Sequence, residues 1–135
     1  MADDVLLRLK LKCDKRAPRV VRASLSSLDE VGGCAQELAL VSSELVSNAV
    51  IHSGCDSRDR LDVSLARCKR GYRLSVSDPG RSGKSAKRVV PRTSGHGGLG
   101  LGIVETLAER WGERRDRHYH VWAEVSASGS PALAA

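Results

Sequence analysis

Three polar residues recur at four-residue spacing near the middle of this 135-residue chain: Glu44, Asn48 and His52. Residues four apart lie on one side of an α-helix. A carboxylate, an amide oxygen and an imidazole on one side can serve a magnesium ion, a water molecule or a phosphate. The alternative is a solvated polar face opposite an apolar stripe, and spacing alone favours that alternative.

A second candidate is Asp78, which begins the tripeptide Asp78-Pro79-Gly80 after an alternating segment. Alternation places Asp78 on the same strand face as Leu74 and Val76. If that face is covered, the carboxylate is an acceptor at the rim of an apolar pocket, suited to an exocyclic amine. Gly80 would let a flat ring approach the backbone. The alternative is an ordinary turn, which these residues favour on their own.

A run of glycines, GHGGLGLG over residues 95–102, precedes a predicted helix. Glycines before a helix let backbone N–H groups converge on a phosphate. The run contains G-x-G-x-x-G, but a long basic loop precedes it where a dinucleotide site needs a strand. It is not a Walker A loop either, because no Gly-Lys-Ser/Thr follows. A flexible hinge is the alternative. The candidate phosphate-binding residues are Gly98, Leu99, Gly100, Leu101 and Gly102.

Strand and helix periodicities alternate unevenly along the chain, which predicts an α+β fold with one domain over residues 5–126 and a flexible tail over 127–135. A basic segment over 81–97 has no periodicity, as in functional or disordered loops. The expected strands cover 5–12, 61–65, 72–76 and 118–125. The expected helices begin near Pro18 and end at Gly32, run from 35 to 52, and run from about 99 to 111.

The formal net charge of +6 suits an anionic partner such as a nucleotide, a nucleic acid or an acidic protein. The basic clusters lack interleaved aromatic residues, which argues against single-stranded nucleic acid. No apolar run could span a bilayer and the N-terminus is acidic, so a cytoplasmic protein without membrane contact is expected. In that compartment the four cysteines, which lack zinc spacing, should be reduced thiols. They are Cys13, Cys34, Cys55 and Cys68.

Taken in order, the three candidate segments resemble the boxes of the GHKL (histidine kinase-like) ATPase superfamily. ELVSNAVIH resembles the N-box, VSDPG the first glycine box and GLGLGIV the second. Together with HVWAEV, they resemble more narrowly the anti-sigma-factor serine kinases and their stand-alone actinobacterial relatives. The resemblance covers residues 5–125. It implies the Bergerat fold, a two-layer α/β sandwich in which helices cover one face of a mixed sheet.

The resemblance also implies ATP and Mg²⁺ as ligands and a role for each candidate. Glu44 would orient or activate the group that attacks the γ-phosphate, and Asn48 would ligate Mg²⁺. Asp78 would accept a hydrogen bond from the adenine amine. The glycines would approach the phosphates, with the basic segment 81–97 as the ATP lid. The remaining nucleotide-binding candidates are His52, Gly80, Leu99 and Leu101.

The function implied is a serine kinase that phosphorylates an anti-sigma antagonist protein, sequesters a sigma factor, or does both. The alternative is an ATP-sensing module that sequesters a protein partner without kinase turnover. Direct nucleic-acid binding rests on charge alone and is not expected. A homodimer is considered because members of this family often dimerise. One departure stands out: relatives often have a Gly-Lys pair where this chain has His118-Tyr119-His120.

Overall fold

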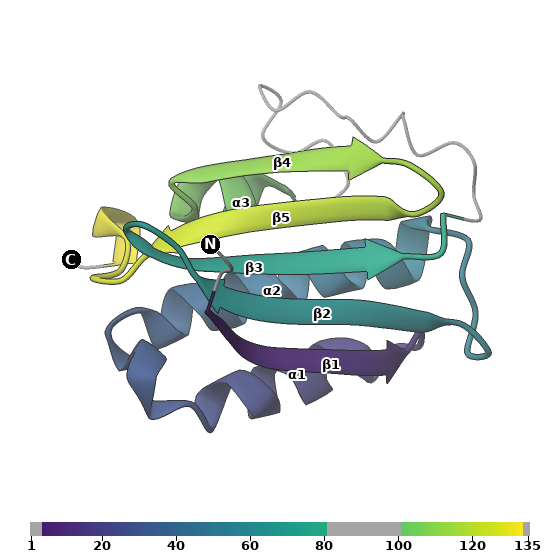
Figure 1. Cartoon of the computed structure of the whole chain (residues 1–135), viewed down its shortest axis with the longest axis horizontal. Helices are drawn as coiled ribbons and strands as arrows, with labels where there is room; N and C mark the ends of the chain where they lie inside the picture. Colours follow the sequence, from purple (N-terminus) through teal and green to yellow (C-terminus); the bar gives the residue numbers. More distant parts are fainter. Residues whose placement is uncertain (1–3, 81–100, 134–135) are drawn as a thin grey trace.

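A five-stranded sheet forms one layer of the computed structural model, which describes residues 4–80 and 101–133 (Figure 1). The strand order is β1-β2-β3-β5-β4. The predicted two-layer α+β fold is confirmed, but the sheet is not mixed, because every pairing between the described strands is antiparallel. Short turns join β2 to β3 and β4 to β5, and such turns permit only antiparallel neighbours. The strands are β1 (Val5–Lys12), β2 (Arg60–Arg67), β3 (Gly71–Asp78), β4 (Arg110–Arg115) and β5 (Tyr119–Ser126).

The three α-helices cover one face of this sheet and leave the other face open (Figure 1). They are α1 (Ala17–Ser26), α2 (Ala35–His52) and α3 (Leu101–Leu107). Helix α2 lies centrally, where it packs against α1, α3 and β3. Its apolar stripe meets the covered face of the sheet, and the core is built from Leu and Val because the chain has no Phe. Fully buried core residues include Leu38, Val41, Leu45, Leu61, Leu65 and Leu74.

Two elements differ from the sequence prediction. The first predicted helix is divided, because α1 ends at Ser26 and the short 3₁₀ helix η1 (Asp29–Cys34) follows. The third predicted helix ends at Leu107 rather than Trp111, and β4 follows at once. Strand β4 is mostly charged and contains Gly112, so it has none of the β-branched pattern that marks a strand. It forms because the Glu109 N–H donates to the Glu124 carbonyl and starts the pairing with β5.

The C-terminal segment docks on the helical layer. The backbone N–H of Ser130 donates to Oε2 of Glu37, a buried acid in the first turn of α2, at 2.6 Å. Gly129 has a φ of +87°, and a Cβ there would lie 2.7 Å from the same carboxylate oxygen. A short 3₁₀ helix, η4 (Pro131–Leu133), follows. The flexible tail over 127–135 stays a prediction, and within it Ser130 supplies the donor that a buried carboxylate needs.

Cys13 and Cys55 form a disulfide, with their Cα atoms 6.2 Å apart. The expectation of reduced thiols is wrong for this pair, because the fold brings the end of β1 beside the loop that follows α2. Cys34 and Cys68 are free. Burial, and then the neighbouring Glu37 carboxylate, raise the pKa of the Cys34 thiol to about 11. None of the helices in the described residues is both long and apolar enough to cross a membrane.

We expect the disulfide to stabilise the fold because it closes a loop and so restricts the conformations of the unfolded chain. The bonded cysteines are 42 residues apart in sequence, and a loop of that size corresponds to about 4 kcal/mol of lost unfolded-state entropy. Urea denaturation of Cys55→Ser should show a loss of that order. Cys68→Ser is the matched control and should unfold like the wild type. A wild-type protein equally stable with and without reductant would contradict the prediction.

Candidate functional site

Helix α2 places Glu44, Asn48 and His52 in three different environments. Each four-residue step turns about 40° around a helix of 3.6 residues per turn, so the three residues form a slanted stripe. Glu44 is half-buried, Asn48 is buried and His52, the last helical residue, is exposed. The stripe is therefore not simply the solvated polar face that spacing alone favoured.

Asn48 has a polar atom without a partner. Its side chain is 6% exposed, and Oδ1 has no hydrogen-bond partner among the residues that the structure describes. A buried acceptor left unsatisfied costs about 1–3 kcal/mol. Such an oxygen fits a ligand that supplies a donor or a cation, and an amide oxygen is among the ligands that Mg²⁺ takes.

Glu44 lies one helical turn before Asn48 on the same helix. Burial raises the pKa of the Glu44 carboxyl above its ordinary value, because partial desolvation disfavours the charged form. A carboxylate with a raised pKa is a better proton acceptor, since the best general base has a pKa near the working pH. The position is therefore suited to proton transfer or to orienting a hydroxyl group.

Asp78 ends β3 on the face that the helices cover, where it is 3% exposed. The backbone N–H of Gly80 donates to its Oδ1 at 2.6 Å. Burial raises the pKa of Asp78, against the opposing effects of that N–H, Arg115, His118 and His120. The tripeptide is thus a turn, as its composition favours, and it also holds a buried acceptor, as the functional interpretation requires.

The turn between β4 and β5 forms a wall beside Asp78 that the sequence analysis did not identify. Gly80 has a φ of +72°, and a Cβ there would lie 2.8 Å from the Arg117 carbonyl oxygen and 3.0 Å from Nη1 of Arg115. Nη2 of Arg115 also approaches the Gly80 carbonyl at 3.5 Å. The only signal for this wall was the departure at His118-Tyr119-His120, which was interpreted as a lost lysine.

Only the end of the glycine run lies within the described residues. Gly98, Leu99 and Gly100 fall outside them. Leu101 is buried and begins α3, and the half-buried Gly102 accepts a hydrogen bond at its carbonyl from Oγ1 of Thr106 at 2.9 Å. Because α3 packs against α2, the end of the glycine run adjoins the helix that positions Glu44 and Asn48.

These elements bring the candidates to one end of the molecule. Helix α2 packs against β3, and both elements end at the same edge, on the right in Figure 1. Asn48 and His52 lie in the last part of α2, and Asp78 is the last residue of β3. An unpartnered amide oxygen and a buried carboxylate thus lie at the same end of the two-layer interface.

Comparison with known proteins agrees with this arrangement. Residues 13–124 match the family model described as the histidine kinase-like ATPase domain. No curated protein was found to match the chain. The matched region includes every candidate residue, from Glu44 in α2 to Gly102 at the end of the glycine run. The chain therefore belongs to the histidine kinase-like ATPase domain family.

Proposed function

We propose that this protein is an ATP–Mg²⁺-dependent regulatory serine kinase that phosphorylates an anti-sigma antagonist protein, sequesters a sigma factor, or does both. Membership of the family makes ATP the expected ligand. The observation that supports the proposal best is the unpartnered, buried Oδ1 of Asn48 at the same end as buried Asp78. A fold does not leave such groups buried without a compensating partner, and a bound nucleotide with its cation supplies one.

Asp78 is proposed to recognise adenine. Its Oδ1 already accepts from Gly80, which leaves Oδ2 for the exocyclic amine. Hydrogen bonds to charged groups contribute about 1.5–3 kcal/mol, and a base without that amine would leave Oδ2 unpaired. Gly80 is proposed to meet the edge of the ring through its backbone, because its positive φ and its close approach to the β4–β5 turn leave no room for a side chain.

The phosphate end is proposed to lie between α2 and the glycine run. Asn48 would ligate Mg²⁺ through Oδ1, and His52 would lie nearby at the end of α2. The bound cation neutralises charge on the phosphates. Backbone N–H groups of the glycine run would contact the phosphate oxygens. The proposed contacts are Gly98, Leu99, Gly100, Leu101 and Gly102.

Glu44 is the proposed catalytic residue. Its partly buried carboxylate would orient the hydroxyl of the acceptor serine and take its proton. Phosphoryl transfer depends mostly on positioning and charge stabilisation, so a small domain can provide what it needs. A homodimer, as family members often form, is compatible with this role.

One observation favours a second candidate function, an ATP-sensing module that sequesters its partner without turnover. Relatives often have a Gly-Lys pair where this chain has His118-Tyr119-His120. Tyr119 is buried, and the ring of His120 lies between Ser77 and Asp116. A lost lysine at this place would weaken nucleotide affinity or turnover.

ATP with Mg²⁺ should raise the melting temperature of the protein. A ligand at about a hundred times its dissociation constant adds roughly 2.7 kcal/mol to the stability of the folded state, which is several degrees for a domain of this size. Scans with GTP, and with ATP plus EDTA, are the controls. No shift at millimolar ATP–Mg²⁺ would refute nucleotide binding.

ATP affinity should fall as the pH is lowered toward the pKa of Asp78, which burial raises above its ordinary value. Protonation removes the charged acceptor, so affinity declines as pH falls through the raised pKa. The stability of the apo protein should instead rise as the pH falls, since burying the charged carboxylate costs free energy that protonation relieves.

Asp78→Asn should bind ATP about 10- to 100-fold more weakly, because the variant loses the charge-assisted hydrogen bond. Titration with a fluorescent ATP analogue between pH 5 and 8 measures the pH dependence of ATP affinity in the wild type and the affinity loss in the variant. If affinity depends on pH equally in the wild type and in Asp78→Asn, Asp78 is not the source of that dependence.

Substitutions of Glu44 and Asn48 should separate catalysis from binding. Glu44→Ala should slow phosphate transfer about 10²–10⁴-fold with little change in ATP affinity, because the group acts mainly in the transition state. Asn48→Ala should weaken binding of ATP–Mg²⁺ itself. Affinity and transfer of labelled phosphate to candidate antagonists would be measured for both. Equal affinity losses would assign Glu44 a structural role, and tight ATP binding by the wild type without transfer would favour the sensor alternative.

A further inference from the structure

The open face of the sheet, opposite the helices, has an ordered arrangement of side chains. Strand pairing aligns most of its outward residues in three rows that run across the strands, and Lys12 and Arg60 form a further pair beyond the third row. The first row contains Ala66, Arg73, Glu124 and Arg110. The second contains Arg8, Ser64, Ser75, Trp122 and Gly112. The third contains Lys10, Asp62, Ser77, His120 and Arg114. The middle row is therefore made of short side chains between Arg8 and Trp122.

Trp122 is held in place by the first row. Cζ of Arg73 lies 4.5 Å from the centroid of the indole ring and Cζ of Arg110 lies 5.5 Å from it. Both guanidinium groups donate to Glu124: Nη2 of Arg73 at 2.7 Å and Nε of Arg110 at 2.9 Å. A Cβ at Gly112 would lie 2.8 Å from the indole, so only glycine leaves this space. Trp and Arg are the residue types that dominate protein interfaces, and here their positions are already fixed.

This face is strongly cationic. Its outward positions hold seven basic and two acidic side chains. Both acids are already engaged on the face itself, since Asp62 pairs with Lys10 and Glu124 pairs with Arg73 and Arg110. Arg114 is also paired, with Asp116 of the β4–β5 turn, and the remaining basic residues leave the face with a net positive charge for a partner to neutralise. The basic residues are Arg8, Lys10, Lys12, Arg60, Arg73, Arg110 and Arg114.

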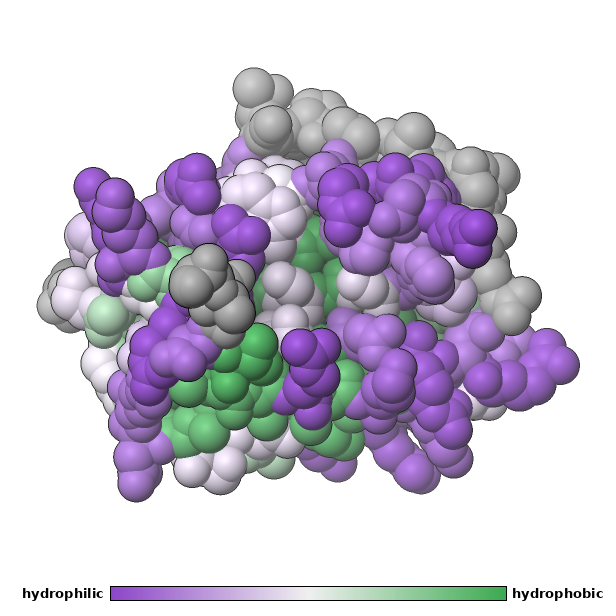
Figure 2. All heavy atoms as spheres, viewed as in Figure 1, coloured by the Kyte–Doolittle hydropathy of each residue, from purple (hydrophilic) through white to green (hydrophobic). Residues whose placement is uncertain are grey.

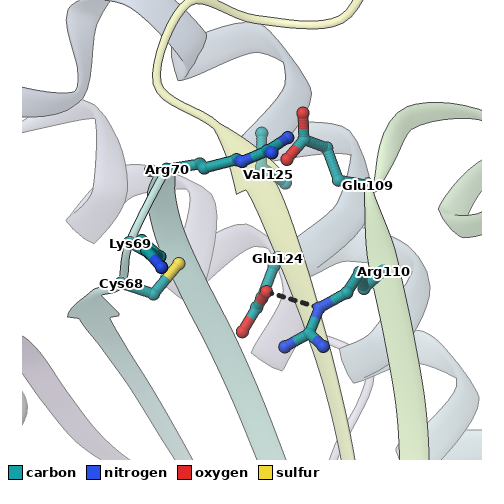
Figure 3. A pocket seen from close by; sticks show the side chains of 8 residues that line it. Cys68, Lys69, Arg70, Glu109, Arg110, Glu124 and Val125 are labelled. Carbon is teal, nitrogen blue, oxygen red and sulfur yellow. Dashed lines mark hydrogen bonds and ion pairs between the residues drawn. The ribbon is translucent and has the colours of Figure 1, made fainter.

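A hollow continues the first row at one edge of the sheet (Figure 3). It has a volume of about 640 Å³ and is lined by residues 68–71, Glu109, Arg110, Glu124 and Val125. Arg110 and Glu124 belong to both the row and the hollow. Figure 3 shows Arg70 and Glu109 extending toward each other across the rim. Three basic and two acidic side chains therefore line a space large enough for a side chain of a partner.

Apolar surface adjoins the cations. Figure 2 shows green surface over the first part of β1, among purple residues. Val5 is 44% exposed there, and Leu6 and Leu7 are half-buried. Aliphatic surface beside positive charge suits a protein segment with apolar and acidic residues. It suits nucleic acid poorly, because guanidinium groups already lie against the indole of Trp122 and bases need a free ring for stacking.

We propose that the open sheet face binds an acidic protein segment that also carries apolar side chains, laid across the strands along the middle row. Its carboxylates would meet the basic rows and its apolar side chains would contact Trp122 and the surface of β1. The inference rests on the proposed role as a regulator that binds a protein partner, and it assigns that partner a surface away from the nucleotide site.

The test uses the full chain and a fluorescein-labelled peptide of four Glu-Glu-Leu repeats, with binding measured by anisotropy. The comparison probes are a peptide of four Lys-Lys-Leu repeats and a twelve-residue oligothymidine. The variants are Arg8→Gln and Arg110→Gln on the open face. Arg19→Gln, on the exposed side of α1, removes the same charge from the opposite face and is the matched control.

The acidic peptide should bind, and each open-face variant should weaken it by about 5-fold or more, as expected for an interface arginine. Arg19→Gln should change affinity less than about 2-fold, as for a charge outside the interface. Equal losses in all three variants would overturn the proposal, as would tighter binding of oligothymidine or no binding of the acidic peptide. The melting shift with ATP–Mg²⁺ should persist in every variant, so failure of this surface and failure of nucleotide binding are distinguishable.

Discussion

The contact between α2 and β3 is the constraint on which the rest of the structure depends. Strand β3 lies in the middle of the sheet, and α2 lies across it with Leu38, Val41 and Leu45 fully buried. Any polar group near this contact loses water. Asn48 and Asp78 lie at its end and are both buried. The packing that stabilises the fold therefore also buries two polar side chains, to which a ligand can supply hydrogen-bond donors or a cation.

Periodicity was sufficient for the elements whose apolar pattern is strong. The predicted bounds of the second helix agree with α2 because its apolar stripe continues for the whole length of the helix. Strand β4 could not be predicted, since its residues are mostly charged and its formation depends on pairing with β5, which lies beyond it in sequence. The Cys13–Cys55 disulfide was missed for a similar reason: no local pattern tells that β1 ends beside the loop after α2.

The candidate site was predicted in its residue types but not in its environments. Equal spacing of Glu44, Asn48 and His52 gives no information on which of them the sheet covers, and only the packing of α2 leaves Asn48 buried and His52 exposed. The wall formed by Arg115 and His118 lies at the turn between β4 and β5. It could not be predicted, because β4 itself has no strand pattern in the sequence. The two sides of the candidate site that lie on α2 and β3 could be inferred from the sequence, because both elements were predicted. The side formed by the β4–β5 turn could not.

Alternation along β3 and β5 assigns the two faces of the sheet to different tasks. Asp78 and Tyr119 point to the helical layer, while Ser77 and His120 point to the open face. His120 joins the faces: its Nδ1 lies 2.7 Å from Oγ of Ser77, and its Nε2 lies 3.1 Å from Oδ1 of Asp116. Asp116 lies in the turn that packs against Gly80, next to the proposed adenine site, so a residue of the open face helps to hold a wall of the proposed nucleotide site. A partner bound across the open rows would therefore contact Ser77 and His120, which hold Asp116 and with it the β4–β5 turn. Such a partner would be linked to the proposed adenine site by these side chains and not by the core.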